Sequence, residues 1–113
     1  MGQPPSYANS ITPVQLIASI DNYDPAGYVA GVTNRLILNP ASGGSTMAGL
    51  LSATNGWAVL ICNSSSVDSI TFTFQDSTTP LNQFSTPQGN PYVLHALTNV
   101  VIVYTVNQWC IVL

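Results

Sequence analysis

The sequence predicts an all-β protein, and more narrowly a jelly-roll-like antiparallel β-sandwich of about eight strands. Three observations lead to this prediction. Short apolar runs rich in Val, Ile, Thr, Phe and Tyr recur along the whole chain. Clusters of Asn, Asp, Ser, Gly and Pro separate these runs. No stretch keeps the 3.6-residue apolar period that an amphipathic helix requires.

The 113 residues are enough for one hydrophobic core, so we expect a single domain. Residues 1–11 are rich in Pro and Ser and show no periodicity, which predicts an extended N-terminal arm before a sandwich over residues 12–113. The expected strands cover residues 13–20, 35–39, 45–51, 56–63, 69–74, 91–97, 100–106 and 109–113.

The expected strands differ in the surfaces they predict. In residues 69–74 hydroxyl side chains alternate with Ile and Phe, so one face should be buried and the other wet. Residues 57–62 (WAVLIC) and 100–104 (VVIVY) are apolar at both parities, which indicates cover on both faces. We expect the second sheet on one side and a neighbouring subunit on the other. The last two runs, joined at residues 106–108, predict a closing hairpin.

Charged residues are scarce in this chain. They make up 4% of the sequence, one Arg and four Asp, against roughly 25% in typical soluble domains. Binding to nucleic acid or to an anionic membrane requires Lys or Arg, so we expect neither as a partner. A surface of Ser, Thr, Asn and Gln gives little colloidal repulsion, which suits a protein that works while packed against neighbours.

Groups able to carry out chemistry are few, and we predict no catalytic site, no cofactor and no metal. His95 lies among apolar residues and is expected as a hydrogen-bonded strand residue, with a Cys–His dyad left open. Cys62 and Cys110 lie in apolar runs, and we expect buried, reduced thiols, with a disulfide as the alternative. Asp21 and Asp24 are expected to cap a turn.

Arg35 is the sole cation of the chain. It is expected either at a solvated strand end or in an ion pair with an Asp or a carbonyl cluster, and we favour the ion pair. Tyr7, Tyr23, Tyr28 and Tyr92 fall in predicted loops. They are expected either to pack the loops or to anchor an interface, for which tyrosine is a favoured residue.

Six motifs follow one another along most of the chain: DNYDPAG at 21–27, RLILNP at 35–40, TMAGL at 46–50, NGWAVLICNSSS at 55–66, SITFTFQDSTTPLNQF at 69–84 and VVIVYTVNQWCIV at 100–112. Their order resembles a module of tailed-bacteriophage structural proteins, found in tail fibres and capsid decoration proteins. Residues 82–84 read Asn-Gln-Phe where many relatives have Asn-Arg-Phe, and residues 105–108 lack the Asp common in that turn. An ion pair of the relatives is therefore not carried over.

The resemblance implies a non-enzymatic β-sandwich protein of a virion. A fibre protein normally needs a long shaft or attachment region before this module, whereas here we count only about a dozen residues before it. We therefore expect a capsid decoration, or cement, protein that binds the capsid exterior and stabilises the shell. It would be made in the bacterial host cytoplasm and reside on the virion surface. Its partners would be the major capsid protein and itself, as a homo-oligomer on the lattice.

The alternative is a tail-fibre or receptor-binding module that recognises host-surface carbohydrate through aromatic platforms such as Trp57 or Trp109. For the decoration protein, we expect the arm and the polar loop 75–91 to make the partner contacts. The expected contact residues are Gly2, Gln3, Pro4, Pro5, Ser6, Tyr7, Arg35, Gln75, Asp76, Gln83 and Tyr92.

Overall fold

The computed structural model describes residues 10–21, 23–24, 27–75, 82–106 and 108–112. Within these ranges the chain is all-β, as predicted, apart from one 3-10 turn at Pro87–Gly89. The strands are β1 (Ser10–Gln15), β2 (Ser19–Ile20), β3 (Arg35–Asn39), β4 (Ser45–Met47), β5 (Ala58–Asn63), β6 (Ile70–Phe72), β7 (Gln83–Ser85), β8 (Tyr92–Leu94), β9 (Asn99–Thr105) and β10 (Gln108–Val112). None of the described segments is a helix long and apolar enough to cross a membrane.

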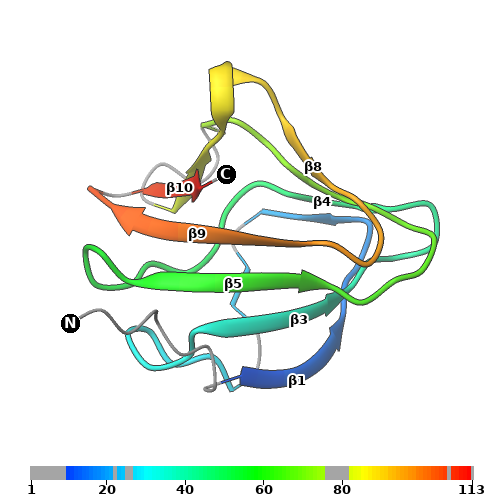
Figure 1. Ribbon diagram of the computed structural model, residues 1–113, viewed down its shortest axis with the longest axis horizontal. Helices are drawn as coiled ribbons and strands as arrows, with labels where there is room; N and C mark the ends of the chain where they lie inside the picture. Colours follow the sequence, from blue (N-terminus) through cyan, green and yellow to red (C-terminus); the bar gives the residue numbers. More distant parts are fainter. Residues whose placement is uncertain (1–9, 22, 25–26, 76–81, 107, 113) are drawn as a thin grey trace.

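The strands form two sheets, one of six strands in the order β1-β3-β5-β9-β10-β7 and one of four in the order β2-β4-β6-β8 (Figure 1). β1, β3 and β5 pair in parallel, and so do β2, β4 and β6. Because the first six strands alternate between the sheets, they form three successive coils. Between β3 and β5 and between β4 and β6 the partners are 25 positions apart, as in Leu36 with Ile61 and Met47 with Phe72, whereas between β2 and β4 they are 27 apart.

After β7 the chain reverses its direction of winding. β8 is antiparallel to β6, and β9 is antiparallel to β5, so β9 points the opposite way to β5 in Figure 1. β10 then forms an antiparallel hairpin with β9, which confirms the predicted closing hairpin, and β7 pairs in parallel with β10 at the sheet edge.

This topology does not confirm the predicted jelly roll. Among the described strands, five of the eight pairs are parallel, whereas a jelly roll is built from antiparallel pairs. The winding is that of a short β-solenoid whose last coil runs in reverse. The sequence could not predict the parallel pairing, because apolar alternation indicates which face of a strand is buried but not the direction of the neighbouring strand.

Predicted boundaries also differ from the structure: β4, β6 and β8 end two to four residues earlier than predicted, which leaves His95 outside a strand, and three further differences change the assignment of a segment. β1 begins at Ser10, so the last two residues of the predicted arm belong to a strand. The predicted strand 13–20 is divided into β1 and β2, because the chain passes from one sheet to the other at residues 16–18. β7 lies inside the predicted loop 75–91, where Phe84 is the single apolar residue of a three-residue strand.

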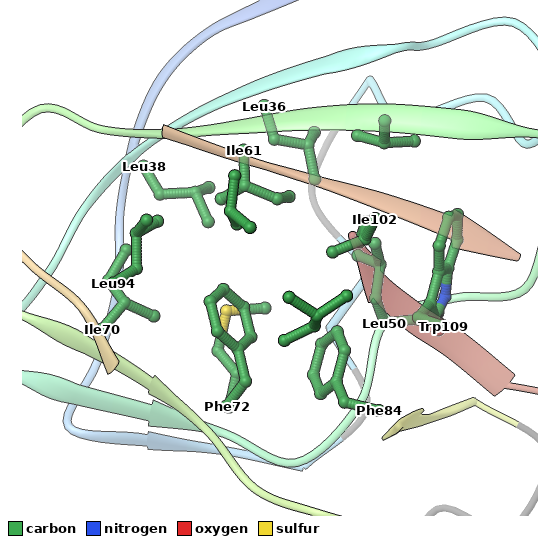
Figure 2. Packing of buried hydrophobic residues seen from close by; sticks show 14 of the residues in the cluster. Leu36, Leu38, Leu50, Ile61, Ile70, Phe72, Phe84, Leu94, Ile102 and Trp109 are labelled. Atoms are coloured by element: carbon green, nitrogen blue, oxygen red, sulfur yellow. Dashed lines mark hydrogen bonds between the residues drawn. The ribbon is translucent and has the colours of Figure 1, made fainter. Parts of the chain in front are cut away.

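The core lies between the two sheets (Figure 2). The predicted alternation of residues 69–74 is confirmed at Ile70 and Phe72, which are fully buried, whereas Phe74 is 37% exposed. Phe72 packs edge-on against Phe84, with ring centroids 4.9 Å apart. Trp109 is also fully buried, and its indole N–H donates to the Leu50 carbonyl at 3.0 Å. The largest core side chain therefore leaves no unsatisfied donor.

A buried amide ties the coils together at the end of β5. Asn63 is 3% exposed, and its side-chain nitrogen donates to the carbonyls of Asp68, Leu94 and His95 at 2.9, 3.1 and 3.2 Å. Its side-chain oxygen accepts the Ser65 N–H at 2.9 Å. The amide thus joins β5 to the turn before β6 and to the end of β8.

We expect Asn63→Ala to lower the free energy of unfolding by about 1–3 kcal/mol, because the buried Leu94 carbonyl and the part-buried Asp68 and His95 carbonyls lose a donor. Asn63→Asp should cost more, since a carboxylate would face those carbonyls. Urea unfolding measures both changes. Asn99→Ala, at an exposed strand position, is the control, expected within about 0.5 kcal/mol of the wild type. Equal stabilities for the Asn63 and Asn99 variants would contradict this role.

Tyr28 gives the fold a dependence on high pH. The side chain is 8% exposed, and its hydroxyl donates to the Leu51 carbonyl at 3.4 Å. Burial, with a smaller contribution from the Asp24 carboxylate, raises the pKa of Tyr28 from 10.0 to about 12. Burial also raises the pKa of Tyr23.

The unfolded chain ionises first as the pH rises, so the stability from neutral Tyr28 is complete below pH 10.0 and is lost progressively toward about 12. We expect a loss of up to about 3 kcal/mol over this interval. Tyr28→Phe should reduce the loss, leaving the part due to Tyr23. Urea unfolding at several pH values measures it. An unchanged pH dependence in Tyr28→Phe would show that Tyr28 is not responsible.

Candidate interaction surface

The six-stranded sheet presents one face to the core and the other outward. Along β3, β5, β9 and β10, buried side chains alternate with partly exposed ones. Most of the partly exposed residues are apolar. We call this set the outer apolar face: Ile37, Ala58, Leu60, Cys62, Val101, Val103, Cys110 and Val112.

The register of the strands joins these side chains into one patch. The rows across the sheet are Leu60–Val101–Val112, Ala58–Val103–Cys110 and Ile37–Cys62. Side chains directly opposite each other on neighbouring strands lie about 5 Å apart. The outer apolar face is therefore continuous across β3, β5, β9 and β10.

Polar residues border the outer apolar face. Arg35 pairs with Leu60 on one side, and Asn99 pairs with Cys62 at one end. Gln108 pairs with Gln83 of β7 on the far side. Apolar patches with a polar border are typical of sites where proteins contact one another.

The outward face of the four-stranded sheet has a different chemistry. Ser19 pairs with Thr46, and Thr46 pairs with Thr71, so a row of hydroxyl side chains crosses β2, β4 and β6. The row ends at Val93 of β8, which is 38% exposed. Hydroxyl groups keep their hydrogen bonds to water, whereas aliphatic groups gain by leaving it. One outward face therefore suits solvent, and the other suits burial.

The structure brings some of the predicted contact residues to this surface. Arg35 and Gln83 lie on the border of the outer apolar face, and the Gln75 side-chain nitrogen donates to Gln108 there at 3.2 Å. Tyr92 does not belong to it, because its ring stacks on the core residue Phe72 with centroids 6.4 Å apart. The other predicted contacts, residues 2–7 and 76, lie outside the described residues.

The aromatic residues mostly serve the core. Tyr28 is buried and Tyr23 packs against the core, which agrees with the loop-packing interpretation, whereas Tyr92 packs against the core from strand β8, so its predicted place in a loop is wrong. Trp109 is fully buried and is not available as a sugar platform. Trp57 is half-buried, with its indole N–H donating to the Thr33 carbonyl at 3.0 Å.

Cys62 and Cys110 are both free thiols, as expected, but they lie on the outer apolar face rather than in the core. Cys62 is opposite Asn99 and Cys110 is opposite Val103, which places them two strands and four residues apart. Sheet spacing makes this separation about 16 Å, too far for a disulfide. Each thiol can therefore report separately on the exposure of this surface.

The environment of Cys62 does not activate its sulfur. Burial raises the pKa of the Cys62 thiol, while the Arg35 guanidinium acts in the opposite direction and lowers it in part. A nucleophilic cysteine needs a lowered pKa, so the net upward direction gives no support to a Cys–His dyad. The ion pair proposed for Arg35 stays a prediction.

The described residues enclose no pocket, and no three His, Cys, Asp or Glu side chains among them form a group able to hold a metal ion. Asp68 stabilises the turn before β6, because its N–H donates to the Ser65 hydroxyl and its carboxylate accepts the Gly43 N–H.

Comparison of the chain with protein-family models, with curated proteins and with solved structures gives no match. The candidate site is thus a surface rather than a cleft.

The proximity of Arg35 and Cys62 predicts a measurable effect on the thiol. In a Cys110→Ala background, the pH midpoint for alkylation of Cys62 should lie above that of the urea-unfolded chain. Arg35→Gln should move the midpoint further upward, because a cation that favours the thiolate is lost. Iodoacetamide labelling followed by mass spectrometry measures both. A downward move, or none, would contradict the electrostatic effect of Arg35 on this thiol.

Proposed function

We propose that this chain is a non-enzymatic structural protein of a bacteriophage virion, a decoration protein that binds the capsid exterior and stabilises the shell. The outer apolar face carries the proposal, because it is a surface suited to burial on a chain with very little charge. Soluble monomers rarely expose continuous apolar patches of this kind.

The central strands support a role in an assembly. A sheet that faces water on one side normally carries polar residues at every second position. In β5 the outward positions are instead Ala58, Leu60 and Cys62, and in β9 they include Val101 and Val103. Burial of apolar surface contributes about 25 cal/mol per Å² before the costs of association. The outer apolar face would gain this stabilisation when it packs against a neighbouring chain.

A decoration protein stabilises a shell by mass action. A protein that binds only the assembled lattice lowers the free energy of that lattice and leaves the free subunits unchanged. Attachment at several lattice points would add avidity without a new kind of contact. Such a role requires a stable binding surface and no reactive group.

The virion setting rests on the order of sequence motifs, which resembles the phage structural module. The proposed partners are the major capsid protein and further copies of this chain. The arm 1–11 and the loop 75–91 are the proposed capsid contacts. Because the whole chain has only five charged residues, we expect attachment to depend weakly on ionic strength.

Sedimentation with capsids tests this function. The purified protein is mixed with DNA-filled capsids of the phage that encodes it, prepared without the protein. We expect it to sediment with them at a fixed ratio to the major capsid protein, and to stay attached when salt is raised to about 1 M. Deleting residues 2–9, which leaves β1 complete, should weaken attachment with an unchanged circular dichroism spectrum.

Protein that remains in the supernatant at every concentration would contradict a decoration role. Binding to a host-surface glycan on an array, without capsid binding, would favour the receptor-binding alternative. Full attachment of the deletion variant would move the capsid contact away from the arm while leaving the decoration role intact.

A further inference from the structure

We propose that the outer apolar face is the contact between two copies of this chain, which pack sheet against sheet in a symmetric dimer. The inference rests on the proposed role in an assembly, and it names the partner that covers this face. It assigns the sheet face to self-association and leaves the remaining surfaces for the capsid.

Strand edges offer a poor route to self-association in this fold. β1, the longest edge strand, contains Pro13, which has no backbone N–H to donate. Its pairing with β3 also shifts register between Ile11 and Val14. The other edge strands, β2, β7 and β8, are two or three residues long. Short or irregular edges discourage strand addition, so the face of the sheet is the better surface.

The charges on this face match a second copy. Arg35, at the border, is its only charged side chain among the described residues, and the face carries no carboxylate. Asp21, Asp24 and Asp68 lie outside the strands of the six-stranded sheet. A partner that binds through opposite charges would therefore have only Arg35 to contact on this face. Two copies related by a two-fold axis would instead place aliphatic side chains against aliphatic side chains, with the border residues at the rim.

The dimensions of the sheet also suit this contact. Sheets pack face to face about 10 Å apart, and a second copy supplies a sheet of equal width. Six strands about 4.8 Å apart and about five residues long cover roughly 29 by 17 Å. Pairing two such faces buries on the order of 1,000 Å² in total, near the lower limit for a specific interface. We therefore expect a dimer that dissociates on dilution.

Sedimentation velocity of the purified chain without capsids, from about 1 to 100 μM, tests this dimer in the range where an interface of this size should dissociate. The wild type should shift from monomer to dimer. Leu60→Glu, which places a carboxylate in the middle of the outer apolar face, should remain monomeric throughout. Thr71→Glu places the same charge on the outward face of the four-stranded sheet and should dimerise like the wild type.

Thiol labelling supplies a second measurement that needs no variant. Cys62 and Cys110 should react with a maleimide more slowly as the protein concentration rises, because the dimer covers both. This result keeps the proposal testable if Leu60→Glu fails to fold.

Monomer at every concentration with constant labelling rates would overturn the dimer. A dimer that survives in folded Leu60→Glu would also overturn it, by placing the interface elsewhere. Thiol protection that requires added capsids would assign the face to the capsid, which removes the dimer but keeps the decoration role. A dimer that never sediments with capsids would support this inference and contradict the proposed function.

Discussion

The alternation of side chains along the central strands is the constraint on which the rest of the structure depends. Val59 and Ile61 of β5, together with Ile102 of β9, must point into the core between the sheets. Their neighbours at the other parity, Leu60 and Val101, are then forced outward. Since those neighbours are apolar as well, a well-packed core and an outward apolar surface arise from the same two strands. The interaction surface is thus a consequence of the fold.

Scarcity of charge gives this surface its character. Ordinary soluble proteins surround apolar areas with Lys and Glu, both of which are absent from this sequence. The border consists instead of the amides Asn99, Gln83 and Gln108 together with Arg35. The outward face of the four-stranded sheet differs, because it carries the hydroxyl row of Ser19, Thr46 and Thr71. An uncharged surface with one apolar face fits a protein that functions beside other chains.

Much of this arrangement could be predicted from the sequence, but the order of the strands could not. The strand at 35–39 matches its predicted bounds, and the apolar runs of β5 and β9 place apolar side chains on both faces of the sheet, whereas cover on the outward face stays a prediction. The 25-residue offset between β3 and β5 is hard to recognise as a repeat in the sequence, because paired positions such as Leu36 and Ile61 share apolar character rather than identity. Leu38 even pairs with Asn63. The predicted contact residues were chosen mainly for polarity and for their place in loops. The apolar patch could not be predicted in this way, because it forms only when the register of β3, β5, β9 and β10 is known.

The central claim is that the outer apolar face is covered when the protein is at work. Hydroxyl-radical footprinting tests it most directly, by comparing the dilute chain with the concentrated or capsid-attached protein. The account predicts that oxidation of Leu60, Val101 and Val103 falls on assembly, while oxidation of Val93 on the opposite sheet does not. Equal oxidation of Leu60 and Val101 in the dilute and assembled states would contradict it.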